Sequence, residues 1–182
     1  LALIAALGVV AGAGRTALAA VPSVQPVTVI CLVAGACLGA RVGAGVGIVS
    51  VLVSNAFLGH GPWTLPQMGL WAAVGASGAL MRPLLRNPAG LAALAVAWAF
   101  AFGWAMNAWF LAAFGPELSV EAFLLVSARS LPFEITGALG SAVIALGLGP
   151  PLARMLTRYD SRVRVTYGSV SGPRSRLPSP SR

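Results

Sequence analysis

Long apolar runs limit the folds open to this chain more than any other feature. The segment from Ala89 to Phe114 contains no charged residue, and runs of about 18 apolar residues or more recur elsewhere. In the whole chain 58% of residues are hydrophobic and 9% are charged, whereas about a quarter of a soluble domain is charged. We therefore predict one all-α membrane domain.

Six hydrophobic segments are predicted to cross the membrane, separated by turns that contain proline, glycine or arginine. Their approximate ranges are 1–20, 27–40, 42–58, 66–81, 89–114 and 131–155. Residues 119–130 are amphipathic and are predicted to lie at the membrane interface. The helices form one domain over residues 1–158, and the Ser-, Pro-, Gly- and Arg-rich segment 159–182 is predicted to be a short, disordered basic tail.

The positions of the arginines predict the orientation in the membrane. If the N-terminus is inside, the inside loops and the start of the tail hold Arg41, Arg82, Arg86, Arg154 and Arg158. The outside loops then hold a single arginine, Arg129. Cytoplasmic loops are enriched in arginine, so both termini are predicted to be cytoplasmic, in a multi-pass protein of the plasma membrane. The net charge of +8 is explained by this topology and not by binding of nucleic acid.

Cysteine and glycine are expected to serve packing in this chain. Cys31 and Cys37 lie in one apolar segment and are interpreted as small buried side chains, with no disulfide. No metal-ligand spacing occurs, so no metal site is expected. Glycines recur every four residues from Gly35 to Gly47, which indicates close helix packing.

Two charged residues inside the spans are the first candidates for a functional site, because such groups are costly in a bilayer. Arg15 lies in the outer half of the first span and Glu134 begins the last one. The two side chains either pair with each other or face an extracellular substrate cavity. The sequence leaves both interpretations open.

Amides beside tryptophans are the second group of candidates. Gln67 and Trp71 share a helix face at i and i+4, and Trp104 and Asn107 share one at i and i+3. An aromatic ring can stack on a flat ligand while the neighbouring amide forms hydrogen bonds with the polar edge of that ligand. The alternative is that the tryptophans lie at the membrane interface and that the side-chain amides form hydrogen bonds between helices.

The loop around residues 54–68 joins these candidates. It carries Asn55, Trp63 and the only histidine, His60, between helix-breaking glycines and prolines. We interpret it as an ordered loop that closes over a small-molecule site, the alternative being an ordinary turn. A boundary position also explains Trp63, and a single loop histidine such as His60 is usually solvated.

Catalytic motifs are not convincing in this chain. Gly75-Ala76-Ser77-Gly78 is similar to the Gly-x-Ser-Gly of rhomboid intramembrane proteases, but that serine needs a histidine on a later span, and His60 precedes it. No carboxylate pair shares a face, so no catalytic residue is proposed. No ATP-binding motif occurs, so active transport would draw its energy from another subunit or from an ion gradient.

Several short motifs together resemble a known family. They are Gly14-Arg15, Val24-Gln25-Pro26-Val27-Thr28, Ser54-Asn55 with Phe57-Leu58-Gly59, Gly61-Pro62-Trp63-Thr64 with Gln67-Met68 and Trp71, and Leu131-Pro132-Phe133-Glu134. On these motifs the chain, over residues 2–158, resembles the substrate-binding S components of energy-coupling factor (ECF) vitamin transporters. The Gly-Pro-Trp-Thr block is similar to one branch of uncharacterised or corrinoid-type S components.

The chain departs from that branch at three positions. Glu134 stands where the branch has Asp, and Gly137 and Ser141 stand near places where His and Asn usually follow. These differences leave the substrate open.

The resemblance implies a membrane subunit that is not an enzyme. It would capture a vitamin or related micronutrient, with a corrinoid as the leading guess, on the extracellular side. Delivery inward would need a transmembrane T component and two ATPase subunits, which use the ATP, so no cofactor is expected on this chain. Small residues on the first helix contact the T component in the family, and Ala2-x-x-x-Ala6 matches that pattern.

The substrate contacts expected on this interpretation come from seven side chains. They are Arg15, Asn55, Trp63, Gln67, Trp71, Asn107 and Glu134. Two alternatives remain. A stand-alone permease would need an ionisable residue near the middle of the membrane, and a structural membrane protein would need no ligand.

Overall fold

The computed structural model describes residues 1–115 and 119–170, with backbone alone from 163 onward. This part of the chain holds six α-helices and no strand, which confirms the all-α prediction. The helices are α1 (Ala2–Ala17), α2 (Val27–Leu38), α3 (Ala40–Leu58), α4 (Thr64–Leu80), α5 (Pro88–Phe114) and α6 (Val120–Val170), with a short 3-10 turn, η1 (Leu84–Arg86), before α5.

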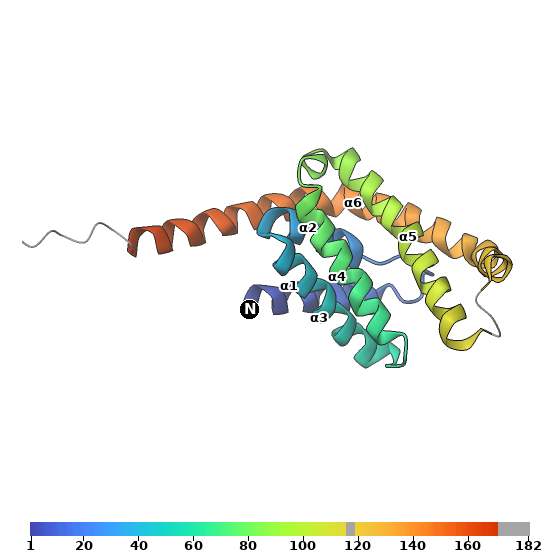
Figure 1. The fold of residues 1–182 in the computed structure, drawn as a ribbon. Helices are drawn as coiled ribbons and strands as arrows, with labels where there is room; N and C mark the ends of the chain where they lie inside the picture. Colours follow the sequence, from blue (N-terminus) through green and yellow to red (C-terminus); the bar gives the residue numbers. More distant parts are fainter. Residues whose placement is uncertain (116–118, 171–182) are drawn as a thin grey trace, which may run out of the picture.

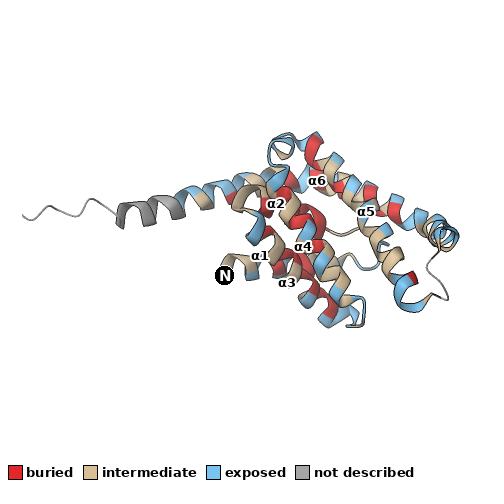
Figure 2. Ribbon diagram, in the orientation of Figure 1, coloured by how far each residue is buried: buried red, intermediate tan, exposed pale blue. Residues whose placement is uncertain are grey.

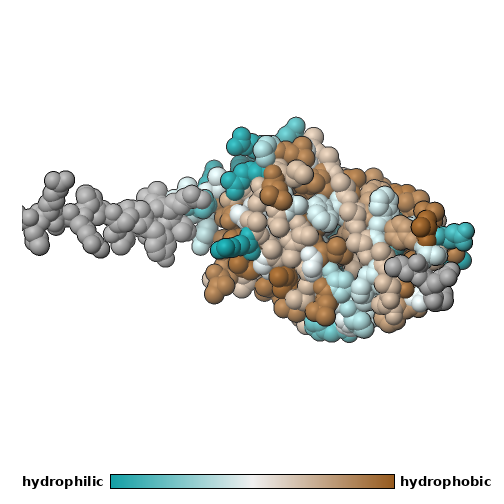
Figure 3. Space-filling view, in the orientation of Figure 1, coloured by the Kyte–Doolittle hydropathy of each residue, from teal (hydrophilic) through white to brown (hydrophobic). Residues whose placement is uncertain are grey.

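The lengths of these helices support membrane crossing for some of the six. Helices α3, α5 and α6 are long and apolar enough to span a bilayer, and α1 and α2 are shorter apolar helices. Figure 3 shows apolar side chains over much of the visible surface, with hydrophilic ones gathered mainly near its margins. The structure therefore agrees with a membrane protein, and six full crossings stay a prediction.

Glycine allows α2, α3 and α4 to touch through their backbones. A Cβ atom at Gly35 or Gly43 would meet the carbonyl group of Gly75 on α4, and one at Gly47 would meet that of Trp71. These contacts confirm close packing for three of the glycines in the four-residue repeat. Gly39 has another role, because its φ of 99° turns the chain between α2 and α3.

The centre of the molecule is α2. Residues 26–35 are all buried, and Figure 2 shows further buried residues in patches along the helices around α2. Cys31 is fully buried, Cys37 is half-buried, and both thiols are free. The prediction of a buried packing residue is confirmed for Cys31, whereas Cys37 is only partly buried.

Helices α5 and α6 form a second unit that packs on α2 and scarcely touches α4. Asn87 starts α5, because its Oδ1 accepts a hydrogen bond of 3.0 Å from the N–H of Ala89. Figure 1 shows the two helices running side by side over much of their length.

Helix α6 differs from the expected arrangement. A separate interfacial segment before a span beginning at Leu131 is wrong, since one helix runs from Val120 to Val170 through Pro132. A proline removes only one backbone hydrogen-bond donor. Ending the helix in an apolar environment would leave several backbone N–H and C=O groups without partners, so the helix continues. In Figure 1 the first turns are seen nearly end-on, so the helix changes direction there, as helices commonly do near proline.

The far end of α6 extends beyond the bundle. A helix of 51 residues is roughly 75 Å long, which exceeds the thickness of a bilayer core. Figure 1 shows this end projecting away from the other helices. The segment expected to be a disordered tail is thus helical as far as Val170, and residues 171–182 lie outside the described residues.

Candidate functional site

Arg15 is the centre of a polar cluster that joins α1, α3 and the loop before α2. Its Nη1 donates to Oδ1 of Asn55 and to Oγ of Ser54, both at 2.7 Å. Its Nε donates to Oε1 of Gln25 at 3.1 Å. All three acceptors are neutral, so hydrogen bonds but no carboxylate hold the guanidinium in place.

Asn55 extends this hydrogen-bond network to α4. Only 1% of its surface is exposed, and its Nδ2 donates to Oγ1 of Thr64 at 3.1 Å and to Oε1 of Gln67 at 3.0 Å. Thr64 Oγ1 also accepts from the N–H of Gly61 at 3.3 Å. The loop at 59–63 is therefore fastened to the same network as Arg15.

An aromatic pair forms the floor of this cluster. The guanidinium carbon of Arg15 lies 5.0 Å from the centroid of the Trp71 ring, at the distance of a cation–π contact. The Trp71 ring lies 4.5 Å from that of Phe102 on α5. A cavity of about 340 Å³ opens here, lined by Arg15, Gln25, Gln67, Trp71 and Phe102 among others.

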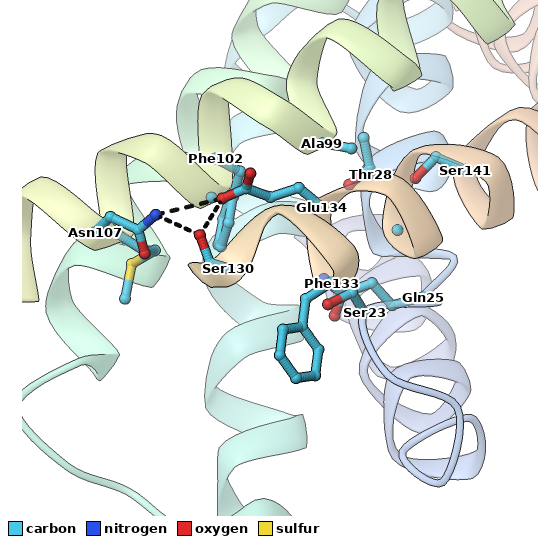
Figure 4. A pocket seen from close by; sticks show the side chains of 13 residues that line it. Ser23, Gln25, Thr28, Ala99, Phe102, Asn107, Ser130, Phe133, Glu134 and Ser141 are labelled. Carbon is cyan, nitrogen blue, oxygen red and sulfur yellow. Dashed lines mark hydrogen bonds between the residues drawn. The ribbon is translucent and has the colours of Figure 1, made fainter. Parts of the chain in front are cut away.

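A second polar cluster joins α5 and α6. Oε1 of Glu134 accepts from Oγ of Ser130 at 2.8 Å and from Nδ2 of Asn107 at 3.3 Å. Nδ2 of Asn107 also donates to Oγ of Ser130 at 2.8 Å and to Oγ of Ser127 at 3.4 Å. Figure 4 shows Glu134, Asn107 and Ser130 drawn together beside Phe102.

This second cluster borders a cavity of about 220 Å³. Thr28 of α2, Phe102 of α5 and Ser141 of α6 complete part of its wall. The two cavities are neighbours, because Ser23, Gln25 and Phe102 line both of them. Loops and helix ends thus form two adjacent cavities with polar residues in their walls at one end of the bundle.

The loop before α2 closes this end against α6. Ser23 has a φ of 60°, the left-handed region that a non-glycine residue enters at a cost. A Cβ atom at Gly137 would come within 3.0 Å of the Ser23 side chain. The place where the resembling branch usually has a histidine is therefore occupied by the loop.

Of the two interpretations left open for Arg15 and Glu134, the ion pair is wrong. Arg15 bonds to α3 and to the loop at Gln25, while Glu134 bonds to α5 and to its own helix. Each side chain is instead hydrogen-bonded to neutral partners, which for Glu134 include Ser130 of its own helix. Neither charge has a counter-ion among the described residues.

The seven expected contacts divide into three groups. Arg15, Gln67 and Trp71 line the larger cavity, with Asn55 directly behind them. Asn107 and Glu134 line the smaller cavity. Trp63 lines neither, since it is 40% exposed and its ring packs over Gly61 in the loop.

Three other expectations can be placed. His60 is exposed, with Nδ1 3.5 Å from Thr64 Oγ1. Ser77, in the protease-like motif, donates to the carbonyl of Val74 at 2.7 Å and accepts from Nε1 of Trp98 at 2.9 Å. Ala2 and Ala6 are exposed on α1, and their expected contact with a T component stays a prediction.

Some site residues had only weak signals in the sequence. Ser54 and Gln25 stand in the motifs quoted above, but nothing marked them as partners of Arg15. Ser130 was assigned to an interfacial segment, and Phe102 could not be told from other aromatic residues of α5. No protein family, curated protein or solved structure matches the chain, so the resemblance to S components rests on the quoted motifs alone.

Proposed function

We propose that this chain is a substrate-binding subunit of a membrane importer, of the kind found in ECF-type transporters, and not itself an enzyme. One observation carries the proposal. Two neighbouring cavities lie at one end of an otherwise apolar bundle, and two buried polar atoms in their walls, Nε1 of Trp71 and Oε2 of Glu134, have no hydrogen-bond partner among the described residues. Polar groups are costly in such surroundings, and a ligand would supply the missing partners.

The placement of the site fits capture from outside the cell. If the N-terminus is cytoplasmic, as the arginine distribution predicts, the loops at 18–26 and 59–63 face the extracellular side. The cavities lie beside the first of these loops, and the second is fastened to Asn55 through Thr64. Transport inward would then require a T component and two ATPase subunits.

The size of the cavities narrows the choice of substrate. At about 220 and 340 Å³, they suit a ligand of one or two rings, stacked near Trp71 and Phe102. A corrinoid is much larger than either cavity. We therefore favour a smaller vitamin or related micronutrient over the corrinoid suggested by the branch resemblance.

Native mass spectrometry of the purified protein tests this proposal. We expect a small molecule to co-purify, and the variant Gln67→Leu to lose it, because Gln67 lines the larger cavity. Thr157→Val is the matched control, since Thr157 lies on the far part of α6. An empty protein that also ignores vitamins, corrinoids and nucleobases would favour a structural membrane protein.

Reconstitution separates the importer from the second candidate, a stand-alone permease. Purified chain in proteoliposomes should bind the co-purified molecule without accumulating it, even with an imposed ion gradient. Gradient-driven uptake by the chain alone would contradict the importer and support the permease. Both charged candidates, Arg15 and Glu134, lie in the polar end of the bundle, which favours binding over ion coupling across the membrane.

A further inference from the structure

Glu134 is a buried carboxylate with half of its acceptors unused. Only 5% of the residue is exposed. Oε1 accepts hydrogen bonds from Ser130 and Asn107, but Oε2 has no partner among the described residues. Both donors are neutral. A buried anion without a nearby cation is strongly unfavourable, so this site is poised for a positively charged donor.

Arg15 presents the opposite situation across Phe102. Its Nε and Nη1 are bonded to neutral acceptors, but Nη2 donates to no described residue. Arg15 also lines the larger cavity. Trp71 Nε1, in the same wall, is a buried donor that lacks an acceptor in the described part of the chain. The guanidinium at the larger cavity therefore has an unpaired donor, and a negatively charged acceptor would be its best partner.

The fold keeps the unpaired acceptor of Glu134 apart from the unpaired donor of Arg15. Each charge is fixed by its own hydrogen bonds, so Arg15 and Glu134 do not satisfy each other. The cavities share Ser23, Gln25 and Phe102 as a common wall. A single molecule that reaches past Phe102 would meet both.

We infer that the ligand is a dipolar molecule with a cationic hydrogen-bond donor at one end and an anionic acceptor at the other. The cationic end binds Glu134, the anionic end binds Arg15, and an apolar ring between them contacts Phe102. This inference rests on the proposed function, and it adds the charge pattern of the substrate. The terminal torsion of Glu134 turns easily, so Oε2 can rotate toward the smaller cavity.

Three probes with the same ring test the charge pattern. They are 4-(aminomethyl)benzoate, which carries both charges, benzylamine, which carries only the cation, and 4-methylbenzoate, which carries only the anion. Their dissociation constants are measured by calorimetry on the full chain in detergent. We expect the dipolar probe to bind roughly 10- to 100-fold more tightly than either relative, as one charged hydrogen bond predicts.

Two variants assign the two ends. Glu134→Gln should bring the dipolar probe down to the affinity of 4-methylbenzoate, and Arg15→Gln should bring it down to that of benzylamine. Arg15→Lys, which keeps the positive charge, covers the case in which Arg15→Gln does not fold. Equal affinities for all three probes, or an unchanged preference in Glu134→Gln, would overturn the inference.

The outcome can be told apart from failure of the proposed function. If native mass spectrometry finds a co-purified molecule that lacks one of the two charges, the importer subunit stands and the dipolar ligand is refuted. If no molecule co-purifies and none of the probes binds, both are refuted. A co-purified dipolar molecule that Glu134→Gln releases would support both.

Discussion

Oδ1 of Asn55 accepts a hydrogen bond of 2.7 Å from Nη1 of Arg15, although the two residues are 40 positions apart. The contact ties α1 to α3, and through Nδ2 of Asn55 it reaches Gln67 on α4. Three helices are thus positioned by one buried amide. The contact sets the orientation of the guanidinium, and with it which nitrogens remain for a ligand.

Replacing Asn55 by leucine should destabilise the protein by about 1–3 kcal/mol, because the half-buried guanidinium of Arg15 loses one acceptor and the buried polar partners of Asn55 lose their hydrogen bonds. The thermal midpoint in detergent measures the effect. Asn55→Asp keeps an acceptor for Arg15 but loses the Nδ2 donor to Thr64 and Gln67, so its midpoint should lie between those of the wild type and Asn55→Leu. A leucine variant as stable as the wild type would show that the hydrogen bond does not matter for folding.

Gly75 and Gly69 lie on the same helix and should respond differently to alanine. A Cβ atom at Gly75 would collide with the backbone of Gly43, whereas one at Gly69 has open space around it. We expect Gly75→Ala to lower the thermal midpoint strongly, by forcing α3 and α4 apart. Gly69→Ala should be neutral or slightly stabilising, since alanine is the better helix former. Equal effects would contradict the backbone contact.

Trp98 donates to Oγ of Ser77 at 2.9 Å and so links α5 to α4. Trp98→Phe keeps the ring but removes the donor, and should cost about 1 kcal/mol. Trp104→Phe is the control, because Trp104 is 48% exposed and makes no hydrogen bond with any described residue. Chemical denaturation of both variants compares the two positions, and a loss confined to Trp104→Phe would refute the assignment.

Glu134→Gln should leave the ligand-free protein as stable as the wild type or more so. Glutamine keeps an oxygen for Ser130 and Asn107, and removes a buried charge that lacks a counter-ion. Thermal unfolding of protein freed of bound molecules measures this. A lower midpoint would mean that the carboxylate has a stabilising partner inside the protein.

The helices were largely predictable because apolar length is a local property of the sequence. The expected segments at 42–58 and 89–114 begin only one or two residues after the starts of α3 and α5 and end at the same residues. Gln67 and Trp71 line one cavity together, since four residues on a helix return to the same face. The continuous α6 was missed because a proline in a membrane helix does not stop it as it would in water.

The partners of the charged residues were not predictable from spacing. A pair between Arg15 and Glu134 was one of two interpretations, because both residues were predicted at the same depth in the membrane. Depth says nothing about direction around a helix, and Arg15 faces α3 whereas Glu134 faces α5. Phe102, which lies between the two cavities, became identifiable only when α4 and α5 were placed together.

The backbone contacts among the glycines of α2, α3 and α4 also decide which part of the protein can yield. Two helices that touch through carbonyl groups have no side-chain rotamers between them to take up a displacement. The seam between α4 and α5 is different, because few residues meet there and those include the rings of Trp71 and Phe102. If the protein rearranges to admit a ligand, we expect the movement at this seam and not between the glycine-packed helices.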